Sequence, residues 1–331
     1  MRGAEPRSQN TCHSRAPASN ITGLLHSVPP VSTLSGAICA LATPFGVADD
    51  AVDFAAFGRL VDSQIAGGTS ALCVAGSTGE AAMLDEDEFV RLVEFAVERA
   101  VGRVPVLVGT GRSGTAATVA QTRRARDAGA DVALVSGPPY VRPTQEGLFR
   151  HFDRVADKGG LPVVLYNIPS RTGCDIAPET VARLAAHSGI IGVKEAVADP
   201  ARVAALVSLR DDRFAILSGD DPSAMQSMLA GADGVVSVAS NVVPWRMAAL
   251  AAACRAGDRE TAGRIDSELR ALYAFLGVEP NPTPVKWCLA QLGIGSDRMR
   301  LPLVALSAGY HDAGHALLRS LAPVEPARAA G

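Results

Sequence analysis

From Gly36 onward, short apolar runs rich in β-branched residues alternate with longer amphipathic stretches. The apolar runs predict strands at 37–42, 70–75, 104–109, 132–136, 162–166, 190–194, 214–218 and 234–239. The intervening stretches have helical spacing, for example at 53–66, 85–101, 115–128, 144–158 and 178–186, and Asp85, Thr144, Asp199 and Asp220 are predicted to cap helix starts. Strands that are apolar on both faces and alternate with helices are typical of a buried parallel sheet.

Eight such strands are the number that closes a (β/α)8 barrel of about 250 residues. A doubly wound sheet is the alternative, but it usually carries a glycine-rich dinucleotide turn after its first strand, and here the residues after that strand are Thr43-Pro44-Phe45. After Pro244 the strand pattern stops, and helices are expected near 244–256, 258–276, 283–293 and 303–319. We therefore predict an α/β fold, a TIM barrel over 34–243 with a C-terminal helical region over 244–322.

The two ends of the chain differ from this pattern. Residues 1–33 contain one acid, Glu5, and many Ser, Thr, Pro and Asn, with no periodic apolar face. We expect a disordered N-terminal extension; a wrongly chosen start codon and an organelle transit peptide are the alternatives, whereas a secretory signal lacks its apolar region. Residues 323–331 are expected to be a short tail.

Composition excludes several classes of protein. The chain has 331 residues, of which 48% are hydrophobic and 20% charged, and a formal net charge of −3. This balance offers no basic patch for nucleic acid or an anionic membrane, and no apolar run reaches the ~18 residues that span a bilayer. The six cysteines are scattered without a CxxC pair, which favours reduced thiols in a cytoplasmic protein. No metal site is expected, because the histidines do not cluster with carboxylates inside the barrel.

Only three of the 31 basic residues are lysines: Lys158, Lys194 and Lys286. Chemistry that needs a primary amine therefore has three candidates. Lys194 ends the apolar strand 190–194, and in a barrel the reacting groups lie at the carboxyl ends of strands. Burial favours the neutral amine, which can form a Schiff base with a carbonyl compound. The alternative is a structural lysine that pairs with Glu195 or extends to the barrel mouth.

Other strand ends carry groups that fit the same chemistry. Tyr166 ends the neighbouring strand and can exchange protons beside Lys194, although it can equally be a core aromatic residue. Ser77-Thr78, between glycines, offers hydroxyl and N–H groups to a small carboxylate. Arg171 can bind a second carboxylate or remain a solvated loop residue. Together these residues indicate a site that holds a 2-oxo acid covalently and takes a second acidic substrate.

The same residues resemble the dihydrodipicolinate synthase/N-acetylneuraminate lyase family of class I aldolase-like enzymes over about residues 35–322. The matching segments are Gly76-Ser77-Thr78-Gly79-Glu80, Tyr166-Asn167-Ile168-Pro169-Ser170-Arg171-Thr172-Gly173, Gly192-Val193-Lys194-Glu195-Ala196, Ser218-Gly219-Asp220-Asp221 and Glu279-Pro280-Asn281-Pro282 through Lys286. The resemblance is greatest to the branch that condenses pyruvate with L-aspartate 4-semialdehyde to 4-hydroxy-tetrahydrodipicolinate in lysine (diaminopimelate) biosynthesis.

This resemblance implies roles for individual residues. Lys194 would condense with pyruvate, and Tyr166 would transfer protons through Ser77 to Tyr140 of a neighbouring subunit. The other positions would bind substrate: Thr78, Gly219 and Val236 would lie at the pyruvate, and Arg171 would bind the semialdehyde carboxylate. The family further implies a homotetramer built from two tight dimers and no cofactor.

Departures from the family pattern concern regulation. Ser77 replaces a common Thr but keeps the hydroxyl. In lysine-inhibited members a polar set binds lysine at the subunit interface, and here the matching positions are Ala81, Glu86, Phe89, Ser113, Ala117 and Pro139. Since little remains to hold an amino acid, we predict weak or absent inhibition by lysine.

Two other functions are compatible with part of this pattern. A sibling lyase of the N-acetylneuraminate lyase type would cleave a sugar-derived 2-oxo acid through the same Lys194 enamine. Arg171 discriminates, because a polyhydroxy chain requires neutral polar groups in its place. A catalytically silent barrel used for binding is disfavoured by the intact Lys194, Tyr166 and Ser77-Thr78.

Overall fold

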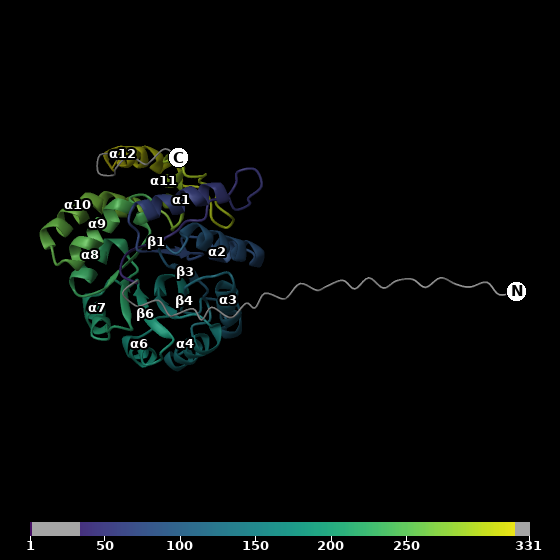
Figure 1. The fold of residues 1–331 in the computed structure, drawn as a ribbon. Helices are drawn as coiled ribbons and strands as arrows, with labels where there is room; N and C mark the ends of the chain where they lie inside the picture. Colours follow the sequence, from purple (N-terminus) through teal and green to yellow (C-terminus); the bar gives the residue numbers. More distant parts are fainter. Residues whose placement is uncertain (2–33, 322–331) are drawn as a thin grey trace.

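Eight parallel strands in the computed structural model pair in sequence order, and β8 returns to pair with β1, so the barrel is closed (Figure 1). The strands are β1 (Gly36–Ala40), β2 (Ala71–Val74), β3 (Val106–Gly109), β4 (Val132–Ser136), β5 (Val163–Asn167), β6 (Ile190–Glu195), β7 (Ala215–Ser218) and β8 (Gly234–Ser237). The structure describes Met1 and residues 34–321, so the expectations for 2–33 and 323–331 lie outside the described residues. All eight predicted strands are confirmed, each with ends within two residues of the prediction.

Helices follow the strands and surround the barrel. Those of the barrel are α1 (Phe54–Ala66), α2 (Glu86–Ala100), α3 (Thr115–Asp127), α4 (Gln145–Gly159), α5 (Pro169–Thr172), α6 (Pro178–Ala185), α7 (Pro200–Val207) and α8 (Asp221–Leu229). Those of the C-terminal region are α9 (Pro244–Arg255), α10 (Arg259–Leu276), α11 (Thr283–Gln291) and α12 (His311–Leu321). Three 3-10 helices complete the described elements: η2 (Ala81–Met83), η3 (Ala239–Asn241) and η4 (Ala308–Tyr310).

Short polar side chains start these helices where the sequence predicts a cap. The Asp85 carboxylate accepts a hydrogen bond from the Glu88 N–H at 2.8 Å, and the Glu88 carboxylate accepts one from the Asp85 N–H at 3.1 Å. This reciprocal pair satisfies two N–H groups that a helix start leaves without an intrahelical partner. Thr144, Asp199 and Asp220 cap α4, α7 and α8 in the simpler form, through one backbone N–H each.

Apolar side chains fill both faces of the sheet. Inside the barrel, Ile38, Leu107, Val164, Leu217 and Val236 pack together with Tyr166. Outside, the larger cluster joins alternate strand residues to the inner faces of the helices. Successive strand residues face opposite sides, so each strand places apolar residues both inside and outside the barrel; the outward Val235 of β8 packs with the C-terminal helices. This explains why the strands read as continuous apolar runs.

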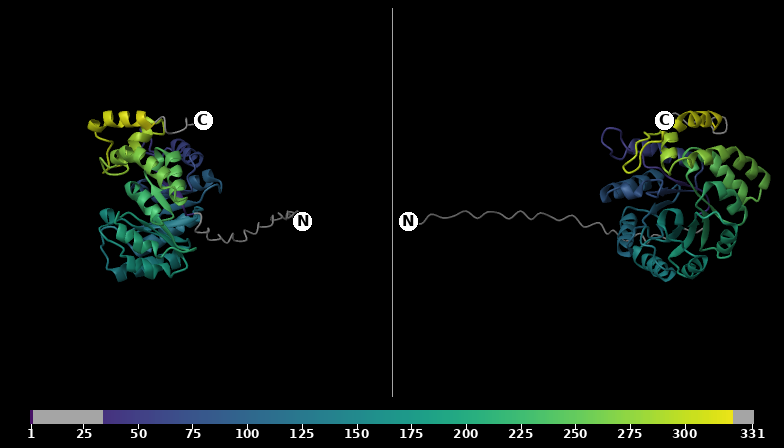
Figure 2. Two further views of the ribbon diagram at one scale, coloured as in Figure 1. Left: turned by 90° about the vertical axis from the view of Figure 1, so that its left-hand side faces the viewer. Right: turned by 180° about the vertical axis from the view of Figure 1, so that it is seen from behind.

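The C-terminal helices cover one side of the barrel, where α9 packs against β1 and α8, and α10 packs against α9 (Figures 1 and 2). The helix expected at 303–319 begins later, at His311. Residues 300–304 lie across the barrel mouth instead. The Arg300 guanidinium holds them there by donating hydrogen bonds to the Glu88 carboxylate and to the Asp50 and Met83 carbonyl oxygens. These contacts outweigh the local helical pattern.

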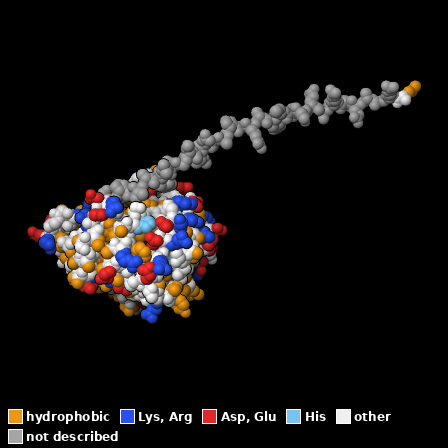
Figure 3. Space-filling model, turned by 90° about the horizontal axis from the view of Figure 1, so that it is seen from below, with side chains coloured by type: hydrophobic (Ala, Val, Ile, Leu, Met, Phe, Trp, Pro, Cys, Tyr) orange, Lys and Arg blue, Asp and Glu red, His pale blue; other side chains and the backbone are white. Residues whose placement is uncertain are grey.

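The surface carries both signs of charge. Figure 3 shows acidic and basic side chains interspersed over the face that it presents, with no large patch of one sign. Within the described residues, no helix is long and apolar enough to cross a bilayer. The five cysteines of residues 34–321 are buried free thiols, and Cys12 lies outside the described range.

Candidate active site

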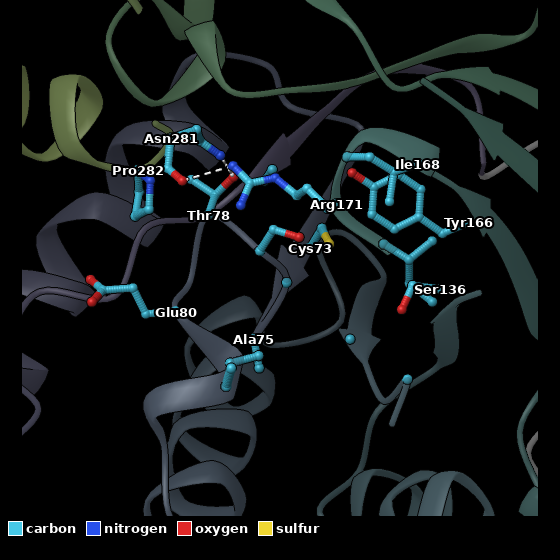
Figure 4. A pocket seen from close by; sticks show the side chains of 18 of the residues that line it. Cys73, Ala75, Thr78, Glu80, Ser136, Tyr166, Ile168, Arg171, Asn281 and Pro282 are labelled. Atoms are coloured by element: carbon cyan, nitrogen blue, oxygen red, sulfur yellow. Dashed lines mark hydrogen bonds between the residues drawn. The ribbon is translucent and has the colours of Figure 1, made fainter. Parts of the chain in front are cut away.

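A cavity of about 500 Å³ opens at the carboxyl ends of the strands. Its walls come from the residues that follow β2, β3, β4, β5 and β7, from Lys194 on β6, and from the C-terminal residues Asn281, Pro282, Pro302 and Leu303. Figure 4 shows side chains from these separate segments converging on one space. This is the face of a (β/α)8 barrel where reacting groups are found.

Lys194 is the one lysine of the three that lines this cavity. It is 5% exposed and faces the barrel interior, and its Nζ lies 4.1 Å from the centre of the Tyr166 ring. The contact follows from strand register, because Tyr166 on β5 is paired directly with Lys194 on β6. The other two lysines are engaged elsewhere: Lys158 is exposed at the end of α4, and Lys286 is paired with Glu80.

Glu195 is not the partner of Lys194, contrary to one reading of the sequence. Adjacent strand residues face opposite sides, so the Glu195 carboxylate points away from the cavity. It accepts hydrogen bonds from the Arg202 Nε at 2.7 Å and from the Asn167 Nδ2 at 3.0 and 3.1 Å. Burial raises the pKa of this carboxyl, and the bonds from Arg202, Val197 and Asn167 oppose that rise. The Lys194 amine is therefore left without a carboxylate partner on its own strand.

Gly219, after β7, gives the Lys194 side chain its space. A Cβ added at Gly219 would lie 3.0 Å from the Lys194 Cε and 3.1 Å from the Glu195 carbonyl oxygen. Any larger residue would have to displace the end of the lysine or the strand backbone. Gly219 thus lies in close contact with the end of the Lys194 side chain.

The turn after β2 presents Ser77 and Thr78 at the cavity wall. Ser77 is exposed, whereas Thr78 is 3% exposed and its Oγ1 accepts a hydrogen bond from the Asn281 Nδ2 at 3.0 Å. Backbone bonds from the Gly79 and Glu80 N–H groups to the Gly76 and Ser77 carbonyls close the turn. The two hydroxyl groups therefore lie on a turn with a fixed backbone.

Arg171 lies on α5, the short helix that follows Tyr166, and lines the cavity. Its Nη2 donates a hydrogen bond to the Asn281 carbonyl oxygen at 2.8 Å, as Figure 4 shows. Because a guanidinium has five N–H donors, this single bond orients the group and leaves donors for an anionic ligand.

Tyr140 and Val236 lie outside the cavity wall. Tyr140 is 93% exposed on the loop after β4, does not line the cavity of its own chain, and has a left-handed φ of 74°. Val236 is buried in the barrel interior with Tyr166, and Val238, two residues further along, lines the cavity instead. Val236 lies within β8, whereas Val238 follows the end of the strand and so lies nearer the barrel mouth.

Several residues of the site have no role in the sequence analysis. Asn281 bridges Thr78 and Arg171, and Cys73, Arg112 and Ile168 also line the cavity. The motif that contains Asn281 is visible in the sequence, but its contact with Thr78 joins residues 203 positions apart. No local pattern encodes such a contact.

The positions that the resemblance assigns to lysine binding do not form a second polar site, and neither do the C-terminal histidines. Phe89 is fully buried, Glu86 forms an ion pair with Arg124, and the Ser113 hydroxyl donates to the Pro139 carbonyl. His311 and His315 both pack against the Trp287 ring. Across residues 34–321, no group of three or more His, Cys, Asp or Glu side chains is placed to hold a metal ion.

Comparison with known proteins gives one consistent result. The model of the dihydrodipicolinate synthetase family matches residues 33–321. The chain is 56% identical over 293 residues to the 4-hydroxy-tetrahydrodipicolinate synthase of Xanthomonas campestris pv. campestris, covering 88% of this chain and 96% of the relative. It is 54% identical to that of Stenotrophomonas maltophilia, with 88% and 98% covered.

Solved structures agree with the sequence relatives. A dihydrodipicolinate synthase from Acinetobacter baumannii, complexed with pyruvate, superposes with a TM-score of 0.85 at 37% identity, covering 87% of this chain and 99% of that one. The dihydrodipicolinate synthase of Aquifex aeolicus gives a TM-score of 0.82 at 39% identity, with 88% and 98% covered.

Proposed function

Because the chain belongs to the dihydrodipicolinate synthetase family, we propose that its cavity condenses pyruvate with L-aspartate 4-semialdehyde to 4-hydroxy-tetrahydrodipicolinate, a step of lysine (diaminopimelate) biosynthesis. The observation that carries this proposal is the Lys194 amine, which is buried in the cavity with its Nζ against the Tyr166 ring and without a carboxylate partner on β6. Relatives named for this synthase, at up to 56% identity over most of the chain, support the choice of substrates.

Lys194 begins the reaction. Its neutral amine attacks the keto carbon of pyruvate to give a carbinolamine, and loss of the hydroxyl group as water leaves the imine. The Tyr166 hydroxyl supplies the proton that the departing hydroxyl needs. A proton then returns to Tyr166 through the Ser77 hydroxyl group. Tyr140 of the partner subunit is the last member of this proton relay.

The second half of the reaction forms the carbon–carbon bond. Loss of a proton from the methyl group of the imine gives an enamine, which attacks the aldehyde carbon of the semialdehyde. The amine of the bound semialdehyde then displaces the Lys194 nitrogen, which closes the ring and frees the enzyme. The net change is the loss of one water, so no redox partner, metal ion or cofactor is required.

Two carboxylates are held by different parts of the wall. The Thr78 hydroxyl group, together with N–H groups of its turn other than those of Gly79 and Glu80, binds the pyruvate carboxylate. The Gly79 and Glu80 N–H groups are excluded because they already donate within the turn. Gly219 borders the space around the pyruvate, and Val236 packs in the barrel interior with Tyr166 rather than on the cavity wall. Arg171 binds the carboxylate of the semialdehyde with the donors that its bond to Asn281 leaves available.

Assembly follows from the position of Tyr140. An exposed tyrosine that does not line its own cavity fits a role in the cavity of a partner subunit. We propose a homotetramer that consists of two tight dimers, in which each dimer shares its Tyr140 residues. We further propose that the enzyme acts in the cytoplasm, which the buried free thiols support.

A lyase of the N-acetylneuraminate lyase type is the second candidate, since it uses the same amine. Arg171 favours the synthase, because it places a cation at the wall where a sugar chain would need neutral polar groups.

The test is reductive trapping with pyruvate. Borohydride should leave a stable adduct on Lys194, located by mass spectrometry of the digested protein, and none on Lys158 or Lys286. A coupled assay with aspartate semialdehyde then measures turnover. An unmodified Lys194, or full turnover by the Lys194→Arg variant, contradicts the proposal.

A further inference from the structure

Two opposite charges are buried together beside the cavity, and the proposed reaction gives neither of them a role. The Lys286 Nζ lies 2.6 Å from the Glu80 Oε1, and the two side chains are 1% and 0% exposed. Burial lowers the pKa of Lys286, and the charge of Glu80 opposes that shift. Burying two opposite charges costs about as much hydration free energy as their mutual attraction returns. A contribution to fold stability is therefore a weak explanation for this ion pair.

The Glu80 carboxylate fixes the turn that carries Thr78. Glu80 ends this turn with a left-handed φ of 52°, a conformation that residues other than glycine rarely adopt. Its second carboxylate oxygen accepts a hydrogen bond from the Arg300 N–H at 3.3 Å. Figure 4 shows the carboxylate turned away from Tyr166 and Arg171, toward the C-terminal region.

The Lys286 ammonium fixes the opposite segment. It lies in α11, five residues after Asn281, and its Nζ is 4.2 Å from the centre of the buried Phe45 ring. The Arg300 guanidinium also lies 4.2 Å from this ring, and it bonds Glu88. The pair is thus embedded in a network whose charged groups all have partners.

Asn281 transmits this arrangement to the cavity. The side-chain amide of Asn281 donates a hydrogen bond to the Thr78 Oγ1. The Thr78 hydroxyl proton is therefore left to donate to a ligand. The backbone carbonyl oxygen of Asn281 accepts a hydrogen bond from the Arg171 guanidinium. This bond orients the second group that is proposed to bind a carboxylate. One residue therefore aligns both donors.

We propose that the Glu80–Lys286 ion pair is a positioning device for the proposed condensation: it holds the turn after β2 against residues 281–286, so that Asn281 aligns the Thr78 hydroxyl and the Arg171 guanidinium. The inference rests on the proposed function for the identity of the two substrates. Neither Glu80 nor Lys286 contacts the reacting atoms, and the effect passes through Asn281.

The experiment compares the Lys286→Met variant with the Glu80→Gln/Lys286→Met double variant. The single variant leaves a buried carboxylate without a counter-charge, so both its melting temperature and its activity should fall. The double variant removes the buried charge and should recover the melting temperature. We expect its KM for pyruvate to stay raised by about tenfold, with a smaller change in kcat, because a binding donor is misaligned.

A KM that returns to the wild-type value together with the melting temperature would show a purely structural pair and overturn the inference. The Glu268→Gln variant is the control, because it removes an ion pair with Arg246 between α9 and α10. It should change the stability of the protein but not the KM for pyruvate or for aspartate semialdehyde. Borohydride trapping of the wild-type protein runs in the same series. Absence of the Lys194 adduct there overturns the proposed function and this inference together, whereas a normal adduct with an unchanged KM overturns this inference alone.

A second variant tests the step through Asn281 should the Lys286 variants not fold. Asn281→Ala removes the side-chain bond to Thr78 and no buried charge, so its melting temperature should stay close to that of the wild type. We expect the same rise of about tenfold in the KM for pyruvate. An unchanged KM in this variant contradicts the proposed route.

Discussion

Lys194 and Tyr166 meet because two parallel strands hold them in register, not because any local motif brings them together. The strand-end position and the scarcity of lysine single out Lys194 in the sequence, and the structure places it in the cavity. The same reasoning does not predict that Asn281 contacts Thr78 and Arg171. Its contacts depend on where the C-terminal region returns to the barrel, a distance in sequence that periodicity does not encode.

The hydroxyl group of Tyr166 can be tested apart from its ring. The Tyr166→Phe variant keeps the aromatic face against the Lys194 amine and removes the proton donor. We expect kcat to fall by about a hundredfold or more, with the fold intact. Single-turnover trapping with pyruvate should slow to a similar degree, and an unchanged trapping rate would exclude Tyr166 from imine formation.

Arg171 separates the two substrates. The Arg171→Ala variant should raise the KM for aspartate semialdehyde by about 10- to 100-fold, the loss expected for charge-assisted hydrogen bonds, while pyruvate trapping on Lys194 continues. Arg123→Ala, which removes an exposed arginine on α3, serves as the control. Equal loss of both activities would mean that Arg171 acts by holding the wall rather than by binding the second substrate.

At the scale of elements, strands and caps follow the sequence pattern closely, because they depend on neighbouring residues. The last helix does not, because Arg300 ties the segment before it to Glu88 and Asp50 across the barrel mouth. The sequence pattern also does not predict the polar network behind β5 and β6. It connects Asn167, Glu195, Asp175 and Arg202, which come from four separate segments.

This network predicts a pH-dependent stability. In the Arg202→Met variant, Glu195 remains buried without its cation, so the free energy of unfolding should fall by about 3–5 kcal/mol at neutral pH. Loss of the guanidinium raises the pKa of Glu195 further above its ordinary value. The folded variant then binds a proton that the unfolded chain has released, so its stability declines as pH rises.

Denaturant unfolding of both proteins at several pH values measures this effect. The deficit of Arg202→Met should be smallest near about pH 5 and grow toward about pH 8, since the unfolded carboxyl ionises first. Arg213→Met, which removes an exposed pair with Asp211, should cost less than about 1 kcal/mol at every pH. A deficit that grows on acidification would contradict the assignment of the effect to Glu195.

At the scale of the whole molecule, the exposed Tyr140 predicts complementation between subunits. Tyr140→Phe and Lys194→Ala should each be nearly inactive. In a mixed dimer, the Lys194→Ala subunit supplies its Tyr140 to the intact Lys194 of the other. Activity of the re-equilibrated mixture should therefore exceed that of either parent, and a mixture no more active than its parents would place Tyr140 in its own chain's site.

Regulation is a second property of the assembly. The positions that hold lysine in inhibited relatives are here occupied by a buried Phe89, by Glu86 in an ion pair with Arg124, and by small residues. We therefore expect sub-millimolar lysine to leave the initial rate unchanged. Inhibition in that range would overturn this prediction.

The ion pair between Glu80 and Lys286 joins positions 206 residues apart, and this has a consequence for the order of synthesis. A nascent chain that has just cleared β8 from the ribosome already contains every strand, and Lys194 with them. It still lacks the counter-charge for Glu80 and the amide that orients Thr78. The chain therefore contains its proposed nucleophile well before it contains the segment proposed to align the substrates.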